Sequence, residues 1–264
     1  MTASQNTDLL ARSCMPRGVG RLLTGSIPPW RGAGPPHTHT TFPYGHAFPW
    51  KWLGESMDLT FKQQHAERMQ DKKAQVQAAM ARAQVERGIV VLLTGHGKGK
   101  TTSAFGMLHR ALGHGLRAGV VQFITGTHAS GEVTFLQQQG LLGQGAMAQV
   151  DYHAMATGCS WQRSDWEADL PAANQAWQAA QRMLADPSLC LVVLDELTFM
   201  LQYGYLALPQ LLQALEHRPA GQSVVITGRS APAPLLALAD TVSEIADTRH
   251  AFQAGVKAQA GVDF

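Results

Sequence analysis

The stretch GIVVLLTGHGKGKTTSAFG, residues 88–106, places an apolar run directly before a glycine-rich turn and a helix-forming segment. A strand, a glycine turn and a helix in that order are the setting of a phosphate-binding loop. The usual spacing is G-x-x-x-x-G-K-[ST], and aligning it on the Gly-Lys-Thr at 99–101 puts Thr94 where the first glycine belongs. The loop is therefore one residue shorter than the common pattern, with Gly95 as its first glycine.

The residue types in this loop suit a nucleoside triphosphate. Glycines permit the dihedral angles that turn successive backbone N–H groups toward an anion, and the N-terminus of the following helix adds favourable partial charge. We expect Lys100 to reach terminal phosphate oxygens and Thr101 to offer its hydroxyl to Mg²⁺ or Mn²⁺. The predicted ATP-binding residues are Thr94, Gly95, His96, Gly97, Lys98, Gly99, Lys100, Thr101 and Thr102.

A second part of the site is predicted at LCLVVLDEL, residues 189–197, where an apolar run ends in Asp195 and Glu196. In a parallel α/β sheet the carboxyl ends of the strands line the ligand crevice, so these carboxylates are expected beside the loop. We predict that Thr101, Asp195 and Glu196 hold the metal ion. An ordinary ATPase would instead use Glu196 to activate water.

From residue 88 onward, short apolar runs rich in β-branched residues alternate with helix-length segments. Strands that are apolar on both faces and separated by helices predict a mainly parallel sheet covered on both sides. The expected fold class is therefore α/β, a three-layer P-loop (RecA-like) fold. Strands are expected at 88–94, 118–125, 147–155, 189–195, 222–227 and 241–247, and helices at 100–114, 164–185, 208–217 and 234–239.

Composition divides the chain into three parts. Residues 1–56 are rich in Pro and Gly and show no periodicity, so we expect a disordered extension. Residues 57–87 are rich in Ala, Gln, Lys, Glu and Arg and predict one long polar helix, with Gly88 as its C-terminal cap. Residues 88–264 form the predicted P-loop domain.

Composition also limits the compartment and the partners. No apolar run approaches the roughly 18 residues of a membrane span, and no secretory signal opens the chain, so we expect a cytoplasmic protein. The three cysteines form no C-x-x-C pair. Residues 1–56 carry five basic and two acidic residues, which leaves residues 57–264 with a net charge of −1. A near-neutral domain argues against nucleic acid as the partner and for small molecules.

Several segments together resemble the ATP:corrinoid adenosyltransferases of bacterial cobalamin biosynthesis and salvage. The resemblance runs in order over about residues 67–264. The motifs that carry it are ERGIVVLLTGHGKGKTTSAFG, ALGHGLRAGVVQFITG, SGE, ATGCSW, RMLADPSLCLVVLDELTFM, VVITGRSAP, LADTVSEI and HAFQAGVKAQAGVDF. A loop of the form T-G-x-G-K-G-K-T is characteristic of that family, so the resemblance accounts for Thr94.

The resemblance implies transfer of the 5′-deoxyadenosyl group of ATP to a cobalt(I) corrinoid, with release of inorganic triphosphate. Cobalt(I) is the nucleophile, so the protein is expected to position the reactants and stabilise the leaving group rather than supply a base. It also implies that ATP binds in a reversed sense, with its terminal phosphate in the loop. Lys100, Thr101 and Glu196 are the residues expected to carry catalysis.

For the corrinoid, the resemblance points to Cys159, Trp161 and Arg229. Related proteins carry an aromatic pair in the segment that matches ATGCSW; Trp161 matches one member, whereas Cys159 stands where phenylalanine is usual. The resemblance further implies a homodimer, an N-terminal helix that helps cover the corrinoid, and a flavodoxin-type reductant.

Two other functions fit the loop. A P-loop ATPase or kinase would release ADP and would require water or a hydroxyl acceptor. An ATP-dependent binding module, such as a RecA-like nucleic-acid protein or a corrinoid carrier, would bind its ligand without adenosyl transfer. The identity of the phosphate product separates the three.

Overall fold

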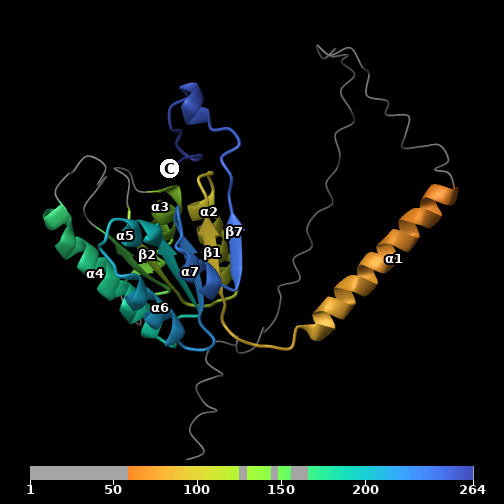
Figure 1. The fold of residues 1–264 in the computed structure, drawn as a ribbon, viewed down its shortest axis with the longest axis horizontal. Coiled ribbons are helices and arrows are strands. Elements are labelled where there is room, and N and C mark those ends of the chain that lie inside the picture. Colours follow the sequence, from red (N-terminus) through yellow and green to blue (C-terminus); the bar gives the residue numbers. More distant parts are fainter. Residues whose placement is uncertain (1–58, 125–129, 144–147, 156–165, 264) are drawn as a thin grey trace, which may run out of the picture. The chain divides into compact units, whose positions relative to one another are not determined.

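The computed structural model describes residues 59–124, 130–143, 148–155 and 166–263 (Figure 1). Helix α1 (Leu59–Arg82), of 24 residues, belongs to one compact unit, and everything from Glu86 onward belongs to another. The helix lies within the range expected from its Ala-, Gln- and Lys-rich composition. It ends at Arg82, so the prediction that Gly88 caps it is wrong; the Gly88 N–H instead donates to the carbonyl oxygen of Ala220 at 2.7 Å. The predicted extension at residues 1–56 lies outside the described residues.

The second unit is built on a parallel sheet, as the sequence predicted. Within the described residues seven strands occur in the order β3-β4-β2-β5-β6-β1-β7, and every neighbouring pair is parallel. The strands are β1 (Val90–Thr94), β2 (Ala118–Gln122), β3 (Leu142–Gly143), β4 (Val150–Ala154), β5 (Leu191–Asp195), β6 (Ser223–Thr227) and β7 (Thr241–Glu244).

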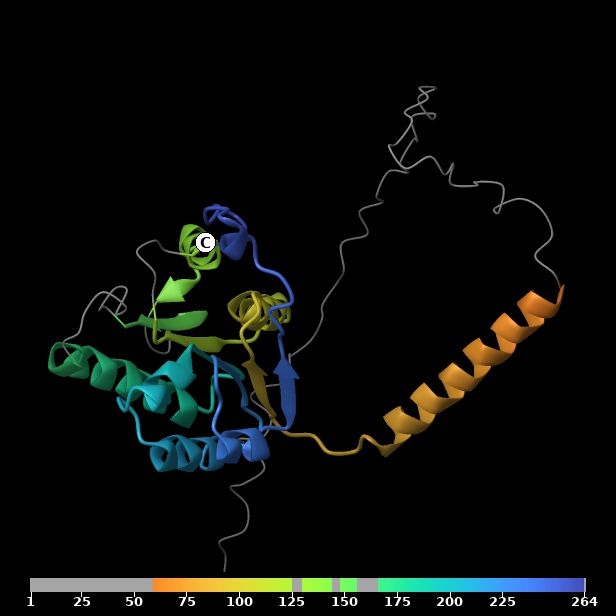
Figure 2. The same ribbon diagram turned by 45° about the horizontal axis from the view of Figure 1, so that its top comes forward.

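Helices cover both faces of this sheet, which confirms the three-layer α/β fold (Figure 2). One face packs against α2 (Lys100–Gly113) and α3 (Gly131–Gln138). The other packs against α4 (Trp166–Ala185), α5 (Leu197–Gln202), α6 (Leu208–Glu216) and α7 (Ala233–Leu238). A short 3₁₀ helix, η3 (Ala251–Ala254), follows in the C-terminal segment. Strand β5 is buried along its whole length, because alternate residues enter the two cores.

Four of the described elements were not predicted: strand β3, helices α3 and α5, and the 3₁₀ helix η3. Strand β3 has two residues and α5 has six, too few for a periodic signal to emerge from the sequence. Helix α3 buries only Val133 and Leu136.

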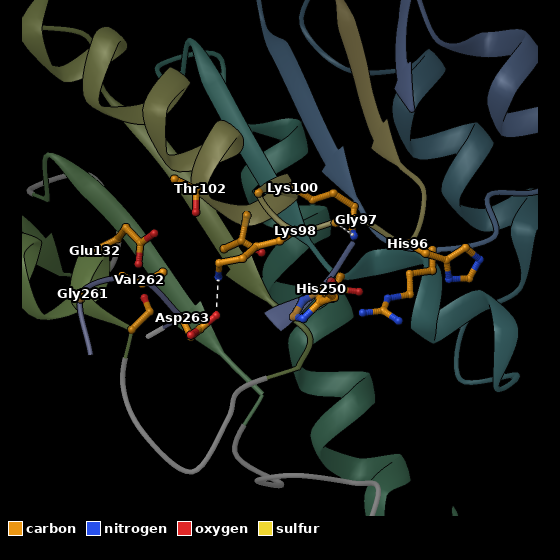
Figure 3. Close-up of a pocket in the computed structure, with 16 residues that line it drawn as sticks. His96, Gly97, Lys98, Lys100, Thr102, Glu132, His250, Gly261, Val262 and Asp263 are labelled. Carbon is orange, nitrogen blue, oxygen red and sulfur yellow. Dashed lines mark hydrogen bonds and ion pairs between the residues drawn. The ribbon is translucent and has the colours of Figure 1, made fainter. Parts of the chain in front are cut away.

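The carboxyl ends of β1, β5 and β6 lead into segments that line a cavity (Figure 3).

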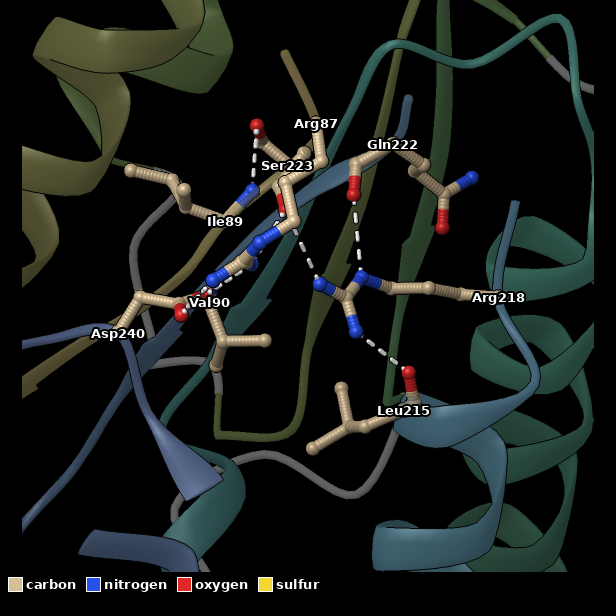
Figure 4. Close-up of polar contacts among 9 residues, drawn as sticks. Arg87, Ile89, Val90, Leu215, Arg218, Gln222, Ser223 and Asp240 are labelled. Carbon is tan, nitrogen blue, oxygen red and sulfur yellow. Dashed lines mark hydrogen bonds and ion pairs between the residues drawn. The ribbon is translucent and has the colours of Figure 1, made fainter. Parts of the chain in front are cut away.

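At the amino ends of the strands, a polar cluster joins β1, β6, α6 and β7 (Figure 4). The Asp240 carboxylate accepts hydrogen bonds from both terminal nitrogens of Arg87 and from the backbone N–H of Val90, the last at 2.9 Å. Arg218 donates to the carbonyl oxygens of Gln222 at 3.1 Å and Gly88 at 3.3 Å. These contacts tie the start of the sheet to the loops on either side.

We predict that Asp240→Asn lowers the melting temperature by roughly 2–4 °C at pH 7, since it weakens about 1 kcal/mol of charge-assisted bonding. The Arg87 hydrogen bond, with the Val90 N–H second, holds the pKa of Asp240 at about 2. A depressed pKa contributes stability above the unfolded-state value near 4 and loses it as the pH falls toward 2. Thermal unfolding of both proteins at several pH values should show their difference narrowing over that range; a constant difference would contradict the prediction.

Candidate functional site

The phosphate loop lies against the segment that follows β7. The backbone N–H of Gly97 donates to the carbonyl oxygen of Ile245 at 2.8 Å, and the N–H of Ile245 donates to the carbonyl oxygen of Thr94 at 2.9 Å. A Cβ atom at Gly95 would lie 2.4 Å from the oxygen of Ile245, and one at Gly97 would lie 2.5 Å from that of Ala246. These contacts require glycine at both positions.

The loop forms one wall of a cavity of about 480 Å³ (Figure 3). The sequence-predicted residues His96 to Thr102 line it, together with Glu196 and Arg229. Thr94, Gly95 and Asp195 do not line the cavity, although they directly precede the lining residues His96 and Glu196 in the chain. Cys159 and Trp161, the other predicted corrinoid residues, lie outside the described part of the chain.

Lys100 is a buried cation in the wall of this cavity. Its side chain is 5% exposed, and Nζ donates to the carbonyl oxygen of Gly97 at 2.8 Å. Burial lowers the pKa of Lys100, and the nearby negative charge of Glu196 opposes that fall. An ammonium group has two further protons to offer, so Lys100 suits an anion placed over the loop.

The two predicted carboxylates occupy different environments. Asp195 is 2% exposed, and its oxygens accept hydrogen bonds from Thr101 Oγ1 at 3.0 Å, Thr227 Oγ1 at 2.7 Å and Gln122 Nε2 at 3.1 Å. Burial raises the pKa of Asp195, and these three hydrogen bonds oppose the rise. Both oxygens of the Asp195 carboxylate therefore already accept hydrogen bonds from the protein.

Glu196 turns toward the cavity instead. Its backbone has a φ of 56°, in the left-handed region, and its N–H donates to Thr227 Oγ1 at 2.8 Å. Burial raises the pKa of Glu196, as does the charge of Asp195, whereas Lys100 and Arg229 lower it. A non-glycine residue in this conformation at the end of a strand is a feature common at functional sites.

The donor set fits a magnesium-type cation. The Thr101 hydroxyl proton is directed to Asp195, which leaves its oxygen lone pairs available, and Glu196 adds a carboxylate to the same cavity. Mg²⁺ favours hard oxygen ligands and is usually held by one or two protein groups plus phosphates. The described residues contain no cluster of three or more His, Cys, Asp or Glu side chains that could hold a metal ion.

Two further segments line the cavity and were not assigned to it from the sequence. Ser130 caps α3 by accepting from the Val133 N–H at 3.4 Å, and Glu132 follows it. The C-terminal segment reaches back to the loop, where Asp263 Oδ1 lies 2.9 Å from Lys98 Nζ. Both segments belong to motifs that carry the family resemblance, SGE and HAFQAGVKAQAGVDF, but neither motif by itself indicates which cavity it lines. The tail residues in the wall are His250, Gly261, Val262 and Asp263.

A second recess of about 310 Å³ adjoins the cavity and shares His96, Glu196 and Arg229 with it. Its other walls include the apolar side chains of Ile124 and Phe199. Thr198 Oγ1 donates to the carbonyl oxygen of Arg229 at 2.7 Å, which fixes the backbone that carries this exposed arginine.

Over the described residues, no helix is long and apolar enough to cross a membrane.

Comparisons with known proteins give one consistent result. A family model described as ATP:corrinoid adenosyltransferase BtuR/CobO/CobP matches residues 86–264. The corrinoid adenosyltransferases of Escherichia coli K12 and Salmonella typhimurium are each 50% identical over 202 residues, which are 76% of this chain and 98% of theirs. The corrinoid adenosyltransferase of Pseudomonas aeruginosa is 47% identical over 202 residues, 76% of this chain and 96% of its own.

We predict that Gly97→Ala weakens ATP binding about tenfold or more, because the added methyl group would displace the loop from Ala246. Overpacking of this kind costs about 1–3 kcal/mol, and 1.4 kcal/mol is tenfold in affinity. The matched control is Gly106→Ala in α2, where the methyl group meets no atom within 4 Å. Calorimetric titration with ATP measures both, and equal affinities for the two variants would show that the loop can yield at Gly97.

Proposed function

The chain belongs to the ATP:corrinoid adenosyltransferase family, and we propose that its phosphate-loop cavity holds the triphosphate of ATP during transfer of the 5′-deoxyadenosyl group to a cobalt(I) corrinoid. The chain is a transferase of cobalamin metabolism. The observation that carries the proposed site is the convergence of a buried Lys100, the Thr101 hydroxyl and Glu196 on one cavity.

The proposed reaction needs little chemistry from the protein. The electron pair of cobalt(I) forms the new bond to C5′ of ATP, the C5′–O bond breaks, and the triphosphate leaves with that bond's electrons. No proton has to be removed, so positioning and stabilisation of the leaving group are what remain for the protein. Lys100, Lys98 and the backbone N–H groups of the loop supply positive charge and donors at the cavity wall.

We assign Thr101 and Glu196 as the protein ligands of Mg²⁺ or Mn²⁺, which would neutralise part of the triphosphate's charge. Both line the cavity and offer oxygen atoms. Direct binding of the metal by Asp195 stays a prediction. The hydrogen bonds to its oxygens support a role in holding Thr101 and Thr227.

The corrinoid assignment is also a proposal. Arg229 and Glu196 stand where the cavity meets the second recess, so a ligand there would lie beside the triphosphate. We propose that Arg229, with Cys159 and Trp161, contacts the corrinoid. Cysteine at 159 offers a thiol where relatives are expected to have an aromatic ring.

The family resemblance supports four further proposals: a homodimer, reduction of the corrinoid by a flavodoxin-type protein, residence in the cytoplasm, and division of the chain at residues 1–56, 57–87 and 88–264. The family match that begins at residue 86 supports the last boundary.

The test is anaerobic incubation of the chain with MgATP and chemically reduced cobalamin. We expect a light-sensitive adenosylated product and an equal amount of inorganic triphosphate. Lys100→Ala should lower kcat by about 10²-fold or more, since the leaving group loses a charged partner. Arg110→Ala, an exposed cation on the same helix, is the control. Release of ADP with an unchanged corrinoid spectrum would refute the proposal, and near-normal turnover by Lys100→Ala would refute the assigned phosphate site.

A further inference from the structure

A row of polar side chains crosses four adjacent strands beneath the phosphate loop. It consists of Tyr152 on β4, Gln122 on β2, Asp195 on β5 and Thr227 on β6, and is called the polar row below. Gln122 and Asp195 are register partners. Because side chains alternate between faces, all four lie on the face that packs against α2, where the residues two positions earlier are the apolar Val150, Val120, Val193 and Val225.

The hydrogen bonds along the polar row converge on the Asp195 carboxylate. Tyr152 donates its hydroxyl proton to Gln122 Oε1 at 2.8 Å. The amide of Gln122 then presents Nε2 to Asp195 Oδ2, at 3.1 Å. The opposite orientation of this amide would set its oxygen against the carboxylate, so Asp195 selects the orientation, and the Tyr152 hydroxyl holds the amide in it by donating to the amide oxygen.

The fixed orientation of the Asp195 carboxylate in turn positions Thr101 and Glu196, the two residues proposed to bind the metal. Its Oδ1 accepts from Thr101 Oγ1 and from Thr227 Oγ1. The Thr227 oxygen in turn accepts from the backbone N–H of Glu196 at 2.8 Å. The orientation of one buried carboxylate thereby sets the direction of the Thr101 hydroxyl and supports the left-handed turn at Glu196.

Because these residues are buried, losing any one of their hydrogen bonds costs free energy that water cannot restore. Gln122 is 7% exposed, Asp195 2% and Thr227 0%. Water cannot readily replace a lost partner in such a place, and a buried group left without one costs about 1–3 kcal/mol. Without Gln122, the Oδ2 atom loses its donor, and the carboxylate plane is held from one side only, by the two threonines.

We propose that Gln122 and Tyr152 are positioning residues for adenosyl transfer, acting through the Asp195 carboxylate to orient Thr101 and Glu196 toward the triphosphate and its metal ion. Neither side chain lines the cavity, so each acts only through the polar row. This proposal rests on the proposed function of the cavity.

The test uses two substitutions that keep side-chain volume, Tyr152→Phe and Gln122→Met, in the full-length chain. We expect kcat to fall about fivefold in Tyr152→Phe and about tenfold or more in Gln122→Met, with the KM for the corrinoid unchanged. Calorimetric titration with inorganic triphosphate gives a second readout. The affinity of each variant for triphosphate should fall by about the same factor as its kcat when Mg²⁺ is present, and should equal that of the unmodified chain when EDTA removes the metal.

The double variant separates positioning from general destabilisation. Because Tyr152 acts through Gln122, adding Tyr152→Phe to Gln122→Met should produce no further loss of kcat or of Mg²⁺-dependent affinity. Tyr205→Phe is the control. It removes a phenolic hydroxyl that donates to Asp169 at 3.5 Å among the residues of the opposite core, and should leave both readouts unchanged.

The possible outcomes are distinct. Additive losses in the double variant, or lower melting temperatures with unchanged kcat and affinity, would overturn the positioning role while leaving the cavity's function intact. Failure of the unmodified chain to bind triphosphate or to release it from ATP would count against the proposed function itself. If Tyr152→Phe does not fold, as judged by circular dichroism, Gln122→Met alone still decides through its Mg²⁺-dependent affinity.

Discussion

The buried carboxylate of Asp195 joins the sheet to the phosphate loop. It lies at the end of the central strand β5, and its hydrogen bonds reach β2, β6 and the first turn of α2. Burying a carboxylate is costly unless donors surround it. That cost fixes where α2 can begin, because Thr101 must stay within hydrogen-bonding distance of Asp195. The position of the loop relative to the sheet follows from this one requirement.

The short loop packs against the backbone segment that follows strand β7. Strand β7 pairs with β1 at the edge of the sheet, and the segment after it packs directly on Gly95 and Gly97. Backbone hydrogen bonds from Gly97 and Ile245 close this contact. The backbone of residues 245–246 thus occupies the space beside the loop, and a loop of this length with Thr94 at the end of β1 fits against it.

The elements that the sequence predicted well are those with strong local signals. Strands β1, β2, β5 and β6 were recognised because they are largely apolar on both faces, and the loop because its spacing and its setting between strand and helix are specific. The different environments of Asp195 and Glu196 were not predicted. Both follow an apolar strand, and only the alternation of faces, with Asp195 aligned with Val193, points to the burial of one of them.

The tail could not have been placed by such reasoning. Asp263 lies beside Lys98 although they are 165 positions apart in the sequence, and the two motifs that contain these residues do not indicate that they meet. Contacts of this kind depend on where the whole chain has already folded. The polar row is intermediate. Two of its members, Asp195 and Thr227, end predicted strands and the other two lie within predicted strands, but their order in space requires the strand order β4-β2-β5-β6.

The lysines of the cavity already have partners, and those partners differ in charge. Lys100 donates to a neutral carbonyl oxygen, whereas Lys98 is paired with the carboxylate of Asp263. When a triphosphate enters, Lys98 exchanges one anion for another, but Lys100 exchanges a dipole for a charge. Negative charge also grows on the leaving oxygen as the C5′–O bond breaks, and only interactions that strengthen at that stage accelerate the reaction. The buried Lys100, with the larger change in partner and the less hydrated position, therefore contributes more than Lys98 to holding the triphosphate, and it favours bond breaking through the negative charge that spreads from the leaving oxygen along the triphosphate to the loop.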